Sequence, residues 1–300
     1  MKGTREIGAK QMFESLQAIR EFPDYIEIWP GHGAGSACGK ALGAVPSTTL
    51  GYERLSSWAF SLDRSDAFSA ALLEGQPEPP RYFGKMKELN RNRPESSVVV
   101  APTPVGALAG EDARSALNNR HGRGDARKMS AVPQVIDTRP SSEFRIRHVA
   151  GTLNLPLEDD LTTWAGWLLD YDRPIAIIDT RERAENVQTM LASIGLDRLI
   201  GFIAPDIAFE LAETTSGSAV SVEQAQRMIQ EEHVRVLDVR SRSEYQESHV
   251  PGAIHCNLGG LPGQISSDEP ENDAVGTIVQ DRDAPVIVHC QGGYRSAAAT

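Results

Sequence analysis

The sequence predicts an α/β protein in which two related parallel-sheet domains follow a different N-terminal segment. The first reason is an internal repeat: the segment starting at Val135 recurs from Val236, with nine of 23 positions identical. This repeat has a period near 100 residues, whereas solenoid repeats run roughly 20–50, so it indicates duplicated domains. The second reason is that short β-branched strands alternate with helices in each copy, as in parallel sheets covered by helices.

The second copy has the sharper element signals. A serine N-cap and apolar spacing predict a helix over 221–232. We expect strands at 234–239 and 285–289, because both runs are short, apolar and β-branched. A helical turn over 243–247 follows the first of these strands, and another helix begins at Ser296.

The first copy repeats this plan. Its expected strands lie at 135–138, 174–178 and 199–203, and its clearest helix spans 183–194. The polar, locally basic stretch 109–131 precedes it and is typical of a solvated connector.

The N-terminal segment resembles neither copy. We expect a strand at 25–29, two helices within 46–73 and a short helix at 86–90. The first helix is expected to bury one apolar side, formed by Ile7, Met12, Phe13, Leu16 and Ile19.

Composition excludes several classes of protein. The net charge of −11 argues against nucleic acid as a partner, because binding the phosphate backbone needs a basic face. No apolar run approaches the length of a membrane span, and the first residues lack a signal peptide, so we expect a cytoplasmic protein without a membrane partner. Three cysteines do not describe a disulfide framework, which directs attention to reactive thiols.

Cys290 lies where a thiol is activated, between a buried strand and a helix. The backbone N–H groups of the following loop can surround the sulfur, and the helix N-terminus adds partial positive charge. A fixed arginine cation at the end of the loop is able to grip an anionic substrate by two donors. The expected substrate-binding loop comprises Gln291, Gly292, Gly293, Tyr294 and Arg295.

The spacing of this loop distinguishes between chemistries. Cysteine phosphatases place five residues between Cys and Arg, whereas four lie between Cys290 and Arg295. Together with Asp238, Arg240, Glu244 and the run 249–253, the loop resembles the rhodanese (sulfurtransferase) domain. The resemblance implies that Cys290 attacks a sulfane sulfur, holds it as a persulfide and passes it on.

Other polar residues near the repeat are expected to have structural roles. Asp238, Arg240 and Glu244 are interpreted as supporting residues, an ion-pair cluster that braces the sheet edge. His249 is expected to pack the loop, and Cys256 to lie in the core.

The first copy lacks the residues for this chemistry. Aligning its second strand with 285–289 places Asp179 opposite Cys290 and Ala184 opposite Arg295. Because a carboxylate cannot carry sulfane sulfur, we predict an inactive, structural rhodanese-like domain.

The N-terminal run 29–43, with a Pro-Gly-His-Gly sequence around His32, resembles the last part of a metallo-β-lactamase-like αββα domain fused to tandem rhodanese domains. Such fusions resemble persulfide dioxygenases. The resemblance implies that His32 and Cys38 lie near the metal site of a parent enzyme. The main metal motif of that fold is absent from these 300 residues, so we expect no metal or cofactor in this fragment, and one iron in the parent, or zinc if it is a hydrolase.

These observations predict four regions. Residues 1–95 are expected to be the C-terminal part of a metallo-β-lactamase-like domain and 96–131 a linker with the start of the next domain. Residues 132–215 would form the inactive rhodanese-like domain and 216–300 a truncated catalytic one, making the chain a fragment cut at both ends.

The expected activity is sulfur transfer through Cys290, within a parent that oxidises low-molecular-weight persulfides. The expected partners are small persulfides, thiosulfate, sulfite or thiols, and a homo-oligomer is left open. Three alternatives remain: a glyoxalase II-type hydrolase with regulatory rhodanese modules, a non-catalytic binding fragment, and a phosphatase or arsenate reductase disfavoured by the loop length.

Overall fold

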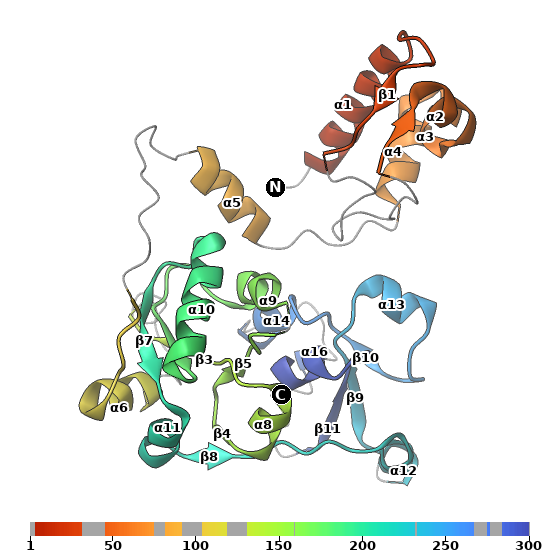
Figure 1. The fold of residues 1–300 in the computed structure, drawn as a ribbon. Coiled ribbons are helices and arrows are strands. Elements are labelled where there is room, and N and C mark those ends of the chain that lie inside the picture. The colour runs from red at the N-terminus through yellow and green to blue at the C-terminus, as the bar shows by residue number, and fades with distance from the viewer. Residues whose placement is uncertain are drawn as a thin grey trace. The chain divides into compact units, whose positions relative to one another are not determined.

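A computed structural model describes residues 4–31, 46–74, 82–91, 104–118, 131–158, 160–231, 233–266, 275–276 and 284–299. The chain divides into two compact units, Met1–Glu78 and Pro79–Thr300 (Figure 1). Parallel sheets flanked by helices confirm the predicted α/β class.

In its described residues, 4–31 and 46–74, the first unit has two short strands and four helices. Strands β1 and β2 pair in antiparallel fashion, and the aromatic rings of Phe13 and Trp58 pack on the buried Phe68 of α4. The bounds of its elements are α1 Thr4–Ile19, β1 Glu27–Ile28, β2 Thr48–Thr49, α2 Leu50–Ser56, α3 Trp58–Ser61 and α4 Ser65–Leu73.

Two expectations for this unit need correction. The first helix forms, but Ile7 and Met12 are 58 % and 50 % exposed, because the helix instead turns Ala9 and Phe13 inward. The segment 46–73 holds three helices rather than two, since the chain is extended at Ser57 between α2 and α3.

The second unit contains both repeat copies. In the residues that the structure describes, the first copy has a four-stranded parallel sheet of order β5-β3-β6-β7, and β6 is buried along its whole length. Its elements, with the preceding α5 and α6, are α5 Tyr82–Arg91, α6 Gly110–Asn118, β3 Gln134–Asp137, α8 Ser141–Ile146, β4 His148–Val149, β5 Leu153–Asn154, α9 Leu161–Leu168, β6 Ile175–Ile178, α10 Arg181–Ser193, β7 Leu199–Ile203, α11 Pro205–Leu211 and β8 Thr214–Thr215.

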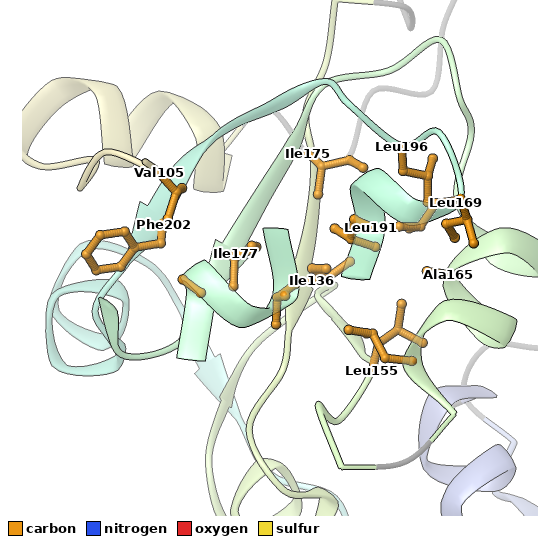
Figure 2. Packing of buried hydrophobic residues seen from close by; sticks show 14 residues of the cluster. Val105, Ile136, Leu155, Ala165, Leu169, Ile175, Ile177, Leu191, Leu196 and Phe202 are labelled. Carbon is orange, nitrogen blue, oxygen red and sulfur yellow. The ribbon is translucent and has the colours of Figure 1, made fainter. Parts of the chain in front are cut away.

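Helices cover both faces of this sheet. Helices α9 and α10 pack on one face, where Figure 2 shows Leu191 of α10 among the strand residues Ile136, Ile175 and Ile177. Helices α6 and α11 pack on the other face. The expected solvated connector is therefore partly wrong: α6 lies inside it and buries Ala113, because two alanines and a leucine recur at helical spacing.

The second copy has a three-stranded parallel sheet of order β10-β9-β11 among the described residues. The central strands of the two copies pair alike: Asp137 of β3 lies opposite Ile178, and Asp238 of β9 lies opposite His289. This register confirms the alignment of Asp179 with Cys290. The elements are α12 Val222–Glu231, β9 Arg235–Asp238, α13 Arg242–Glu247, β10 Ile254–His255, α14 Leu261–Ser266, β11 Val286–His289 and α16 Tyr294–Ala299.

Helix α9 connects the cores of the two copies. Its residues Leu161 and Ala165 are buried in the first core, whereas Trp164 and Leu168 pack against both cores. Within the described parts of the chain, no helix is both long and apolar enough to cross a membrane.

Candidate active site

Cys290 follows the last residue of β11, at the carboxyl end of the parallel sheet and just before α16. Ligand sites of open α/β sheets commonly lie at this edge. Its side chain is half-buried, and Gln291, Gly292 and Gly293 after it are exposed. Cys290 is therefore accessible to a small substrate while remaining supported by the sheet.

The loop after Cys290 needs glycine at one position. Gly293 has φ +84°, in the left-handed region that costs a residue with a side chain roughly 1–2 kcal/mol. A methyl group added at Gly292 or Gly293 would meet no atom of the described residues within 4 Å. The requirement at Gly293 is thus conformational, and the loop leaves room on this side for a substrate.

The sulfur of Cys290 accepts hydrogen bonds from the backbone. The N–H groups of Gly293 and Ser296 donate to Sγ at 3.1 and 3.4 Å, and Ser296 Oγ lies 3.6 Å away. Burial alone would raise the pKa of the Cys290 thiol. The Ser296 hydroxyl, the two N–H groups and the charge of Arg295 outweigh burial, so the pKa lies below its ordinary value.

Ser296 was not among the residues expected in the site. Its hydroxyl donates to the carbonyl oxygen of Gly293 at 2.9 Å, and the hydroxyl oxygen lies 3.6 Å from the sulfur, so this side chain closes the loop and contacts Cys290. The sequence feature that could have indicated Ser296 is its place in the first turn of the predicted helix, because a serine there readily forms hydrogen bonds with nearby backbone groups.

Arg295 faces Glu244 rather than open solvent. Its two terminal nitrogens each donate to a Glu244 carboxylate oxygen at 2.7 Å. This pair, assisted by Ser241, lowers the pKa of Glu244 to about 2. These two bonds use two of the five N–H donors of the guanidinium, so Glu244 holds the cation near Cys290 and the grip of Arg295 on a substrate stays a prediction.

Asp238 and Arg240 form the brace predicted for them. The Arg240 guanidinium donates to Asp238 Oδ2 at 2.7 Å and to the carbonyl of Ser248 at 2.7 Å. Burial would raise the pKa of Asp238, but bonds from Arg240 lower it overall. His289 Nε2 lies 3.0 Å from Asp238 Oδ2, so this side chain also faces the brace.

His249 packs the loop, as predicted. Its Nδ1 lies 2.8 Å from the carbonyl oxygen of Tyr245, and its ring stacks on the Tyr245 ring at 4.0 Å. His148 and Phe144 repeat both contacts in the first copy, at 2.8 and 3.8 Å. A feature present in both copies, one of them without the cysteine, is structural.

Cys256 is buried in the core, as expected. It follows β10, and Cys290 follows β11, on opposite sides of β9. Two strand spacings amount to roughly 9–10 Å between backbones, beyond the reach of a disulfide. Cys256 is therefore not a partner for Cys290 in this arrangement.

The first copy has an ion-pair network where the second has the thiol. Asp179 accepts hydrogen bonds from Thr138 Oγ1 and the Thr180 N–H, each at 2.7 Å. Arg183 pairs with Asp179 at 2.9 Å and with Glu158. These partners satisfy the carboxylate within the domain, and no sulfur nucleophile is present.

His32 and Cys38 lie outside the described residues. Among the residues that are described, no group of three His, Cys, Asp or Glu side chains is placed to hold a metal ion. The described part of the chain thus does not supply the iron or zinc site that the resemblance implies for a parent enzyme.

Comparisons with known proteins agree with this site. A family model described as "Rhodanese-like domain" matches residues 221–300. A metallo-beta-lactamase structure from Staphylococcus aureus subsp. aureus COL is 35 % identical, with a TM-score of 0.52, over 68 % of this chain and 52 % of that one. The chain thus spans about half the length of that protein.

Two further matches are more distant. A thiosulfate sulfurtransferase structure from Pseudomonas aeruginosa is 18 % identical, covering 74 % of this chain and 43 % of that one, with a TM-score of 0.27. The HTH-type transcriptional regulator Rv0324 of Mycobacterium tuberculosis is 23 % identical over 198 residues, 62 % of this chain and 80 % of that protein.

The rhodanese-like match covers the Cys290 loop, and this domain supports sulfur transfer as the general class of activity. Residues 221–300 match the model of a rhodanese-like domain, and the chain is similar to that metallo-beta-lactamase structure over 68 % of its own length.

Proposed function

We propose that the chain transfers sulfane sulfur through a persulfide on Cys290. The thiolate attacks the outer sulfur of thiosulfate or of a small persulfide. A new S–S bond forms on Cys290, and sulfite or a thiolate leaves with the electron pair of the broken S–S bond. An acceptor nucleophile then attacks the outer sulfur and regenerates the Cys290 thiolate, so no external oxidant is needed.

One observation carries the proposal: Cys290 Sγ accepts hydrogen bonds from the backbone N–H groups of both Gly293 and Ser296. Beside it, a methyl group added at Gly292 would meet no atom of the described residues within 4 Å. These donors stabilise the Cys290 thiolate before it attacks the donor, and again when the acceptor takes the outer sulfur and releases the thiolate. Arg295 adds positive charge beside the sulfur, and Glu244 holds its terminal nitrogens in place.

We propose a low-molecular-weight persulfide as the physiological donor, in a whole protein that also oxidises such persulfides. The likeness to a metallo-beta-lactamase and the run around His32 support the proposal that the whole protein oxidises persulfides. The described residues hold no metal cluster, so every step above is assigned to Cys290 and its neighbours alone.

Thiocyanate formation from thiosulfate and cyanide tests the transfer. We expect activity in the wild type, none in Cys290→Ser, and near wild-type activity in Cys256→Ser, the matched control. After incubation with donor alone, mass spectrometry should find one added sulfur atom on the Cys290 peptide. Full activity in Cys290→Ser would contradict the proposal; phosphate release from an aryl phosphate without sulfur transfer would favour a phosphatase.

A further inference from the structure

Helix α9 belongs to the inactive domain and yet reaches the active-site loop of the other domain. Trp164 of α9 packs against the second core, and its ring meets the ring of Tyr294 edge-on, with centroids 6.2 Å apart and planes at 64°. We propose that Trp164 is a positioning residue for the Cys290 loop and acts through Tyr294. This inference rests on the proposed function of Cys290.

Tyr294 is the one aromatic side chain within the loop 291–295. It lies between Gly293, whose N–H donates to the sulfur, and Arg295, which Glu244 holds. The neighbouring Gly292 and Gly293 are exposed, and a methyl group added at either would meet no atom of the described residues within 4 Å. The Tyr294 ring therefore links this half of the loop to α9, in addition to the hydrogen bonds that Ser296 and Ala297 donate to the Gly293 carbonyl.

Fixing the Tyr294 ring also fixes the backbone on both sides of it. Helix α16 begins at Tyr294, so the ring sets where the N–H of Ser296 in the first turn is directed. Helix α16 additionally contacts α8 and β5 of the first copy. Without the Trp164 contact, the donors from Gly293 and Ser296 would sample other directions, and the thiolate would lose part of its stabilisation.

The same helix offers a matched control. Trp167 lies one turn further along α9 and packs on Gly259, where a methyl group would come within 2.2 Å of the Trp167 ring. Trp167 therefore joins the same two domains but does so away from the Cys290 loop. If only general packing between the domains mattered, substituting either tryptophan would shift the pKa of the Cys290 thiol equally. If Trp164 positions the loop, only substitution of Trp164 would shift it.

The test compares Trp164→Leu with Trp167→Leu in the full chain, using the pH dependence of Cys290 alkylation by iodoacetamide, followed peptide by peptide. We expect Trp164→Leu to raise the apparent thiol pKa by roughly half a unit or more, which lowers the thiolate fraction about threefold below that pKa. Trp167→Leu should leave the thiol pKa unchanged, and Trp164→Phe should restore it.

A second variant keeps the proposal testable if Trp164→Leu folds poorly. Tyr294→Leu should raise the thiol pKa similarly, and adding Trp164→Leu to it should have no further effect. Equal thiol pKa values in wild type, Trp164→Leu and Tyr294→Leu would overturn the inference, as would equal shifts in the two tryptophan variants. Failure of the proposed function would look different, because Cys290→Ser would then leave sulfur transfer intact whatever the thiol pKa.

Discussion

Glu244 accepts two hydrogen bonds of 2.7 Å from the guanidinium of Arg295, and so joins the helix after β9 to the loop after β11. The carboxylate also accepts the N–H of Ser241 at 2.9 Å, which ties it to the start of α13. The site is thus held from two strands at once, and the pair gives the first prediction.

Stability of the second domain should depend on pH through Glu244. Its folded-state pKa is about 2, below its ordinary 4.5, so its contribution is present above pH 4.5 and is lost as the pH falls toward 2. Glu244→Gln should remove about 1–2 kcal/mol of stability at pH 7 and much less at pH 3. Urea unfolding at both pH values measures this; an equal loss at pH 3 and pH 7 would contradict it.

Ser296→Ala should raise the pKa of the Cys290 thiol. The hydroxyl contact to Sγ and the bond to the Gly293 carbonyl are both removed, while the Ser296 N–H stays. We expect sulfur transfer at pH 7 to fall roughly three- to tenfold, the effect of one hydrogen bond worth about 1 kcal/mol.

Ser193→Ala is the control for that change. The Ser193 hydroxyl also donates to the carbonyl three residues earlier, that of Met190, but it lies in the first domain. Transfer rates and the pH profile should match the wild type. Equal losses in the two serine variants would show that the Ser296 effect is not local to the sulfur.

Gly293→Ala should destabilise the second domain through backbone strain alone. At φ +84° an alanine costs roughly 1–2 kcal/mol, although space for its methyl group is available. Gly292→Ala is the matched control, since its site is equally open and has no left-handed φ. Unfolding free energies of the two variants should differ by about this amount; equal values would exclude strain as the cause.

Asp179→Asn should weaken the first domain without changing the chemistry of the second. It removes the ion pair with Arg183 while keeping the size of the side chain, and should cost about 1–3 kcal/mol. Calorimetry should report the loss, and sulfur transfer per folded molecule should stay constant. A several-fold fall in transfer by folded protein would instead assign the first domain a direct part in the reaction.

The repeat made much of the fold predictable. Because Val135 and Val236 begin equivalent strands, the alignment of Asp179 with Cys290 followed from the sequence, and the strand registers confirm it. The loop after Cys290 was recognisable because its residues are consecutive. The spacing between Cys290 and Arg295 is therefore visible in the sequence and indicates the class of chemistry.

Contacts between distant segments were not predictable in the same way. Glu244 and Arg295 are 51 residues apart, and neither local sequence indicates that the two side chains form an ion pair. The buried side of α1 was misjudged because Ile7 and Ala9 both fit a helical pattern, and only packing against α4 decides between them. The sequence around Trp164 indicates only an ordinary core residue, because its contact with the second core is visible only in the folded structure.

The network around Asp179 also shows what oxidation would do to the other domain. Cysteine oxidised to the sulfinic acid becomes an oxyanion that the cell does not ordinarily reduce. The first copy has such an oxyanion by sequence, held by Thr138, the Thr180 N–H and Arg183. An over-oxidised Cys290 would carry a negative charge at the position that Asp179 occupies in the first copy, and like the first copy it would have no sulfur nucleophile there.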